Sequence, residues 1–159
     1  MEQTKVWVGI VIGSKSDSAV AQEAEHVLER LGVPFETRVL SAHRMPKETT
    51  EYAKSARERG LKVIIAMAGL AAHLPGVVAS YTTLPVLGVP ISGGVLGGLD
   101  ALLSIVMMPG GVPVGCLALD RQGARNAAVL AAEIIALSDP DIASSVDGMR
   151  AELSGGGTL

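Results

Sequence analysis

The feature that most constrains the fold is a series of short strand-like runs that alternate with helical segments. The first run covers residues 6–12 and is almost wholly apolar, as in a strand buried on both faces of a sheet. Further runs of β character cover residues 34–40, 61–67, 85–89 and 112–119. This alternation predicts five parallel strands joined by right-handed helical crossovers.

Helical patterns fill the intervals between these runs. An apolar stripe at helical spacing follows the first run and stops at Gly32, and Pro46 suits the first turn of a polar helix that runs to Gly60. A short helix is expected to end near Tyr81. Three more helices are expected at residues 99–108, 122–137 and 139–153, before a loose tail at 154–159.

We therefore expect one α/β domain over residues 1–159, whose last part (about 139–159) is a C-terminal helix and a loose tail. Its predicted architecture is a three-layer α/β/α sandwich with a flavodoxin-like, five-stranded parallel sheet in the order 2-1-3-4-5. Ligands of such sheets bind beyond the carboxyl ends of the strands, near the switch between strands one and three. The loops at 13–17, 41–46 and 68–76 all open on that edge and can converge on one site.

Charge and aromatic content argue against a nucleic-acid-binding surface. Lys and Arg total 13 against 16 Asp and Glu, the net charge is −3, and the chain has only one Trp, two Tyr and one Phe. A surface built from cations and stacking rings is therefore not expected. The first five residues lack the features of a signal peptide, and the single Cys116 cannot form an internal disulfide, so we expect a cytoplasmic protein.

The segment between Leu84 and Leu119 is unusually apolar, with Asp100 as its only charged residue. Prolines and glycine pairs interrupt it repeatedly, whereas a membrane span needs roughly 20 consecutive apolar residues. No membrane association is expected. A small monomer seldom exposes this much apolar surface, so we expect a homo-oligomer with a large subunit interface.

The first loop, Gly13 to Asp17, combines a glycine, two hydroxyl side chains and a following helix N-terminus. Backbone N–H groups and the helix dipole at such a position favour an anion such as phosphate. Ser14 and Ser16 suit this role, and Asp17 suits the hydroxyl groups of a ribose. Helix capping by the same three residues is the alternative that the loop alone leaves open.

The second loop places His43 beside Arg44, directly after a strand and before a helix that starts at Pro46. Imidazole titrates near neutral pH, and guanidinium offers a planar fork to phosphate or carboxylate. A backbone-bonded histidine and a surface arginine are the structural alternatives. The position of both residues on the ligand-binding edge favours a functional role.

In the third loop, the small residues Ala68 and Gly69 allow a planar ligand to approach the backbone closely. For His73, by contrast, a structural role is favoured over a catalytic one. We expect it to pack beside Leu74 and Pro75 at the start of a helix. The three histidines lack a plausible metal spacing, and one cysteine cannot complete a zinc site, so no metal is expected.

Six motifs in order resemble the N5-carboxyaminoimidazole ribonucleotide mutase family of bacterial-type purine biosynthesis enzymes. They are GSKSD at 13–17, SAHR at 41–44, AAHLPG at 71–76, LPVLGVP at 84–90, SIV-x-MP at 104–109 and NAA-x-LAA at 126–132. The resemblance extends from Val8 to about Leu137. SAHR with AAHLPG also resembles the mutase class more than the related animal-type carboxylase, for which we expect Lys in place of Arg44.

The resemblance implies an octamer of flavodoxin-like subunits that moves a carboxylate from exocyclic N5 to ring carbon C4 of aminoimidazole ribonucleotide. It implies no ATP, metal or organic cofactor, and a small-molecule substrate as the partner. His43 would carry the proton, while Ser14, Asp17 and Arg44 would bind the nucleotide. The positions that would line the same pocket are Ser16, Ala68, Gly69, Ala71, His73 and Leu74.

Four positions depart from the pattern of this family. Met67 and Leu70 replace glycines that are often found near the third loop, Met45 replaces a Thr, and Met107 stands where Gln is common. Bulk at Leu70 is expected to narrow the pocket. None of these changes removes a group that the chemistry needs.

Other functions fit the sequence less well. A carboxylase that uses free carbon dioxide and unmodified aminoimidazole ribonucleotide would share the pocket and is the nearest alternative. A flavin-binding electron carrier would need aromatic residues in these loops, which contain none. A phospho-receiver domain would need an Asp at the end of strand three and a Lys after strand five, where this chain has Ala68-Gly69 and Asp120-Arg121.

Overall fold

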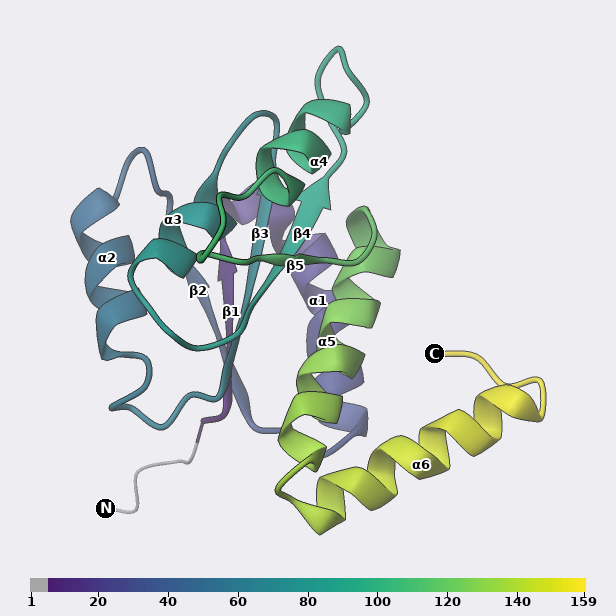
Figure 1. The fold of residues 1–159 in the computed structure, drawn as a ribbon. Coiled ribbons are helices and arrows are strands. Elements are labelled where there is room, and N and C mark those ends of the chain that lie inside the picture. Colours follow the sequence, from purple (N-terminus) through teal and green to yellow (C-terminus); the bar gives the residue numbers. More distant parts are fainter. Residues whose placement is uncertain (1–5) are drawn as a thin grey trace.

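The computed structural model describes residues 6–159 and centres on a parallel five-stranded sheet in the order β2-β1-β3-β4-β5 (Figure 1). The strands are β1 (Val8–Ile12), β2 (Phe35–Val39), β3 (Val63–Gly69), β4 (Val86–Ile91) and β5 (Gly115–Cys116). Each neighbouring pair is parallel. The predicted flavodoxin-like sheet and its strand order are therefore confirmed.

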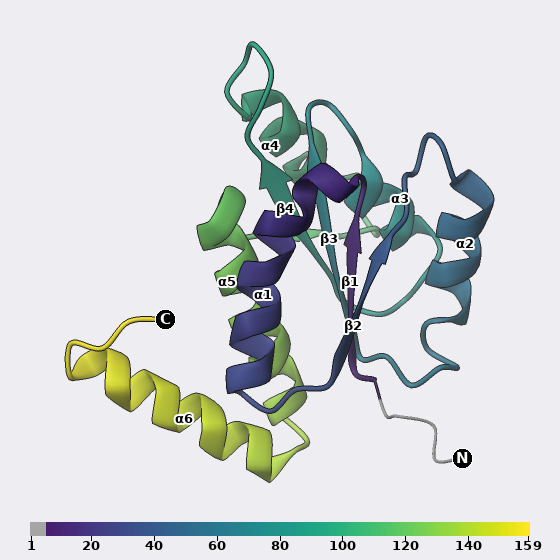
Figure 2. The same cartoon turned by 180° about the vertical axis from the view of Figure 1, so that it is seen from behind.

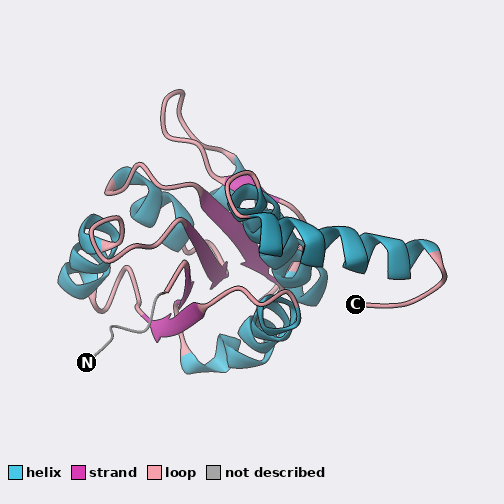
Figure 3. Cartoon of the chain, turned by 90° about the horizontal axis from the view of Figure 1, so that it is seen from below, coloured by secondary structure: helices cyan, strands magenta, loops and turns pink. Residues whose placement is uncertain are grey.

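Helices cover both faces of this sheet (Figures 1 and 2). The helices are η1 (Lys15–Asp17), α1 (Ser18–Arg30), α2 (Pro46–Ser55), α3 (Leu74–Ser80), α4 (Leu99–Val106), α5 (Asp120–Ala136) and α6 (Pro140–Ser154). Helices α1 and α5 pack on one face, and α2 and α3 lie on the other. Helix α6 packs against α5 and extends away from the sheet (Figure 3).

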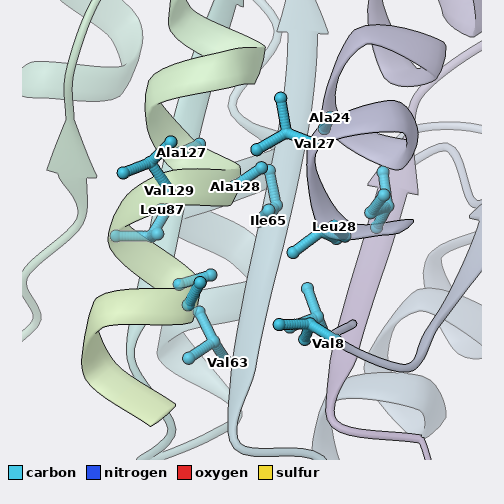
Figure 4. Close-up of a cluster of buried hydrophobic side chains, with 14 of the residues drawn as sticks. Val8, Ala24, Val27, Leu28, Val63, Ile65, Leu87, Ala127, Ala128 and Val129 are labelled. Carbon is cyan, nitrogen blue, oxygen red and sulfur yellow. The ribbon is translucent and has the colours of Figure 1, made fainter. Parts of the chain in front are cut away.

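Alternation of side chains along each strand divides the core between these two layers. Ile10 and Ile65 are register partners, and both point toward the layer of α1 and α5. That layer is closed by small residues of α5, including Ala127 and Ala128, which let the helix approach the sheet closely (Figure 4). The neighbouring Ile64 belongs to the opposite core, beneath α2 and α3. The central strands are thus fixed from both sides, which holds their carboxyl ends in place.

The observed boundaries of two strands and one helix differ from those expected. Strand β5 has only two residues instead of the predicted 112–119, because Pro113 lacks an N–H and residues 109–112 form a turn. Strand β3 continues to Gly69, so Ala68 and Gly69 belong to the strand rather than to the loop. Helix α2 ends at Ser55, and the chain turns before Gly60, whose φ is +92°.

The C-terminal tail is held against the body, although the sequence predicted a loose segment. The guanidinium of Arg30 donates a hydrogen bond from Nη1 to the carbonyl oxygen of Thr158, at 3.1 Å. Leu159 packs against the core formed by α1, α5 and α6.

Across residues 6–159, no helix combines the length and the apolar character that crossing a bilayer requires.

Candidate functional site

A pocket of about 460 Å³ lies over the carboxyl ends of β1, β2, β3 and β4. It is open at the sheet edge where the three loops were expected to converge. Its lining comprises Gly13, Ser14, Ser16, Asp17, Ser41, Ala42, His43, Arg44, Ala68, Gly69, Leu70, Ala72, Leu74, Ile91, Ser92 and Gly93. The structure thus brings eight of the ten predicted site residues to one cavity: Ser14, Ser16, Asp17, His43, Arg44, Ala68, Gly69 and Leu74.

The loop after β1 forms a compact turn that opens onto the pocket. Ser14 is the N-cap of η1, and its Oγ accepts a hydrogen bond from the backbone N–H of Ser16 at 3.3 Å. The hydroxyl of Ser16 donates to Oδ1 of Asp17 at 3.2 Å. Asp17 precedes α1 but makes no side-chain capping bond to it. Ser14 therefore caps η1, while Asp17 caps neither helix through its side chain and lies on the pocket wall.

The loop after β2 is tied to the loop after β1 through Arg44. Its Nη2 donates a hydrogen bond to the carbonyl oxygen of Gly13 at 3.0 Å. The Oγ of Ser41, a residue that is only 8% exposed, accepts from the backbone N–H of Arg44 at 3.2 Å and from its Nε at 3.4 Å. These contacts hold the guanidinium against the backbone of the first loop.

His43 lies at the centre of this second loop, with its side chain exposed on the pocket wall. The turn that carries it is closed by a hydrogen bond from the N–H of Met45 to the carbonyl oxygen of Ser41, at 2.8 Å. Met45 packs against the core under α2, and its own carbonyl oxygen accepts from the hydroxyl of Thr49 at 2.8 Å. The backbone of His43 is thereby fixed on both sides of this lining residue.

The end of β3 supplies the floor of the pocket. Ala68 is almost fully buried, and a Cβ on Gly69 would lie 3.3 Å from the carbonyl oxygen of Ile91, so a larger residue would crowd the neighbouring strand. Leu70 follows with φ of +56°, a left-handed conformation that a branched side chain rarely adopts. Its side chain is 58% exposed and forms part of the pocket mouth.

Ala71 and His73 do not line this pocket, in contrast to the assignment that the family resemblance implied. The Nδ1 of His73 lies 2.6 Å from the carbonyl oxygen of Ser104 on α4, and its ring packs over Gly76, where a Cβ would lie 2.0 Å from Nε2. The hydroxyl of Ser104 in turn lies 3.4 Å from the carbonyl oxygen of Ala71. The imidazole therefore joins the third loop to α4, as its position at a helix start suggested.

The sequence did not identify the contribution of β4. Ile91, Ser92 and Gly93 complete the pocket at the carboxyl end of that strand. They carry no titratable group, so residue type gave no signal. Their position did provide one, because β4 pairs with β3 and must end at the same edge. Ser41 was also missed, although it opens the SAHR motif.

Within the part of the chain that the structure describes, no group of three or more His, Cys, Asp or Glu side chains could hold a metal ion. The polar groups of the pocket are instead hydroxyls, one carboxylate, one imidazole and one guanidinium. Such a set suits a phosphorylated, hydroxyl-bearing ligand and a proton transfer near neutral pH.

Comparison with protein families and curated proteins gives a consistent result. The family model described as AIR carboxylase matches residues 7–155. A protein of Vibrio cholerae called N5-carboxyaminoimidazole ribonucleotide mutase is 54% identical over 145 residues, which cover 91% of this chain and 90% of the relative. A Bacillus subtilis protein of the same name is 54% identical over 143 residues, covering 90% of this chain and 88% of the relative.

Solved structures give the same result at the level of the fold. The crystal structure of Treponema denticola PurE aligns with a TM-score of 0.85 and 27% sequence identity, covering 95% of this chain and 93% of that chain. The crystal structure of a PurE2 variant from the same organism aligns with a TM-score of 0.86 at 26% identity, covering 96% and 93% of the two chains.

Proposed function

Because this chain belongs to the AIR carboxylase family, we propose that it is an N5-carboxyaminoimidazole ribonucleotide mutase, an isomerase of purine biosynthesis. Its reaction converts N5-carboxyaminoimidazole ribonucleotide to 4-carboxy-5-aminoimidazole ribonucleotide. Relatives named as this mutase share 54% identity with almost the whole chain, and the resemblance found in the sequence motifs is confirmed. The names of these relatives favour the mutase over a carboxylase that uses free carbon dioxide.

In this proposal the first and second loops bind the nucleotide. Arg44 and the hydroxyl and N–H groups of the first loop hold the phosphate, and Asp17 accepts hydrogen bonds from the ribose hydroxyls. Support comes from the bond between Arg44 and the Gly13 carbonyl, which places the cation beside Ser14 and the N-terminus of η1. Binding energy from these remote groups holds the ring in register for the reaction.

His43 is proposed to carry the proton between the two half-reactions. Its imidazolium donates a proton to N5, the C–N bond of the carbamate breaks with its electron pair remaining on nitrogen, and carbon dioxide is released. The electron-rich C4 then attacks carbon dioxide to form the new C–C bond. The neutral imidazole finally removes the proton from C4, so the histidine returns to its starting state and the net change is an isomerisation.

Small residues around the pocket suit the carbon dioxide intermediate. Ala42, Ala68 and Ala72 all lie on the wall, where they present short apolar side chains. They leave space for the gas next to the ring and offer it no competing nucleophile. This arrangement would favour recapture by C4 over escape.

The observation that carries the proposal is the meeting of His43, Arg44, Ser14 and Asp17 in one cavity. The test offers purified protein the N5-carboxylated substrate without ATP, then aminoimidazole ribonucleotide with bicarbonate, and compares the two rates. Faster turnover of the N5-carboxylated substrate is expected. Equal or faster carboxylation of the second substrate would support the direct carboxylase instead.

We further propose that the chain assembles as a homo-octamer in the cytoplasm. One side of α4 exposes Leu99, Leu103 and Val106 at helical spacing, with exposed fractions of 54%, 49% and 47%. Met107 extends this apolar surface and is 74% exposed. An apolar surface of this kind is typical of subunit interfaces. Native mass measurement tests the assembly, and a monomer at micromolar concentration would contradict it.

A further inference from the structure

Asp120, the first residue of α5, makes an unusual contact with the pocket wall. Its carboxylate Oδ1 accepts a hydrogen bond from the backbone N–H of Ser92 at 2.7 Å. Its own backbone has φ of +52°, in the left-handed region, which Asp and Asn adopt more readily than most residues other than glycine. The Asp120 side chain thereby links the carboxyl end of β5 to that of β4.

The segment that this bond anchors has little conformational preference of its own. Residues 92–98 contain four glycines, and three of them, Gly94, Gly97 and Gly98, have positive φ angles of 62°, 59° and 96°. A Cβ on Gly98 would lie 3.0 Å from the Cα of Ser92, so the two ends of the segment touch. A glycine-rich loop loses much backbone entropy when it is ordered, so a single charged acceptor at its base has a large influence on its position.

Ser92 and Gly93 line the pocket on the side of β4, whereas His43 lies on the side of β2. The strand order places three strand spacings between these two sides, or roughly 14 Å at ~4.8 Å per spacing. The segment held by Asp120 is therefore the wall opposite the acid–base group.

We propose that Asp120 is a positioning residue for the mutase reaction, acting through the Ser92 amide to set the far wall of the substrate pocket. This inference rests on the proposed function. Because a lost wall contact weakens ground-state and transition-state binding alike, its loss should raise KM and leave kcat nearly unchanged.

Three variants of the full-length protein separate the acceptor from the backbone conformation. Asp120→Asn keeps a side-chain oxygen and tolerates positive φ, and Asp120→Gly keeps the backbone conformation but removes the acceptor. Asp120→Ala removes both. We expect the KM of Asp120→Asn to stay within about 2-fold of the wild-type value. Asp120→Gly should raise KM about 10-fold with little change in kcat, because it loses a hydrogen bond to a charged group. Asp147→Asn, at an exposed carboxylate on α6, is the matched control.

Hydrogen exchange of the Ser92 amide supplies a readout that needs no substrate. Exchange should be slow in wild type and in Asp120→Asn, and about 10-fold faster or more in Asp120→Gly. An unchanged KM together with a protected Ser92 amide in Asp120→Gly would overturn the inference. An Asp120→Asn variant as impaired as Asp120→Gly would also overturn it. A wild-type protein without mutase activity would overturn the proposed function, while the exchange data would still decide whether Asp120 holds the wall.

Discussion

Arg44 reaches from the loop after β2 to the loop after β1, where its Nη2 donates to the carbonyl oxygen of Gly13 at 3.0 Å. Strands β1 and β2 are neighbours in the sheet, so the contact joins two loops that line the pocket over their carboxyl ends. The same guanidinium keeps further N–H donors for a phosphate. One side chain therefore ties the two loops together and, in the proposed function, presents charge to the phosphate.

Replacement of Arg44 by alanine should mainly weaken substrate binding. The loss of a charge-assisted contact to phosphate is expected to raise KM about 10- to 100-fold, with a smaller effect on kcat. Arg44→Lys retains the charge but lacks the fork that reaches both Gly13 and phosphate, so it should recover only part of the affinity. Steady-state kinetics on the N5-carboxylated substrate measure both effects. An unchanged KM in Arg44→Ala would rule out the phosphate assignment.

Replacement of His43 by asparagine should leave the fold and nucleotide binding intact and remove the proton carrier. The side chain is exposed on the pocket wall, so the substitution leaves no cavity in the core. Turnover should fall by at least ~10²-fold, the lower range for general acid–base catalysis. Circular dichroism and substrate titration serve as controls for folding and binding. Turnover close to that of wild type would exclude the histidine mechanism.

Leu70 allows a test of the left-handed backbone at the pocket mouth. Leu70→Gly and Leu70→Ala remove nearly the same side chain, but only glycine adopts φ of +56° without steric cost. The glycine variant should therefore be more stable than the alanine variant by about 1 kcal/mol, net of the larger backbone entropy of glycine. Urea unfolding at a fixed protein concentration measures the difference. Equal stability would show that the backbone relaxes at this position.

The ion pair between α1 and α5 predicts a specific acid sensitivity. The guanidinium of Arg125 donates to the Glu23 carboxylate at 2.8 Å and, with Arg121, holds the pKa of that carboxyl below its ordinary value of 4.5, against the opposing effect of burial. The pair thus stabilises the fold above about pH 4.5, and this contribution is lost as the pH falls through the lowered pKa.

Arg125→Met should therefore cost about 0.2–1 kcal/mol in the free energy of unfolding at neutral pH. The difference from wild type should shrink once the pH falls below the ordinary pKa of the Glu23 carboxyl. Arg121→Met is the matched control, because Arg121 lies 3.6 Å from Glu23 and is 69% exposed, so its effect should be smaller. A cost for Arg125→Met that stays constant with pH would contradict the assignment of the lowered pKa to this pair.

The sequence predicted the sheet because the signals for strand and helix agree along most of the chain. Buried runs such as that around β3 cannot be confused with amphipathic helices, and the loops that follow them must share one edge. His43, Arg44 and Asp17 were placed correctly on this reasoning. The range predicted for strand β5 was too long, because a proline and two glycines nearby outweigh the apolar composition of this segment.

Details set by side-chain direction could not be predicted from residue type. Met67 stands where the family often has a glycine near the third loop, but its side chain is fully buried among α1 and α5, on the same side of β3 as Ile65. Ala71 was placed in the pocket by resemblance, but the turn from Gly69 to Ala72 leaves it exposed. Ser92 gave no chemical signal at all, and only the register of β4 beside β3 brings it to the site.

The order of elements also constrains when the pocket can form during synthesis of the chain. Every residue that lines the cavity lies between Gly13 and Gly93, and these residues are synthesised before α4, α5 and α6. One face of β3 and β4, however, is covered by α5, which begins only at Asp120. A nascent chain that has completed its binding residues therefore still exposes one face of β3 and β4, and the site becomes stable only when α5 has also emerged.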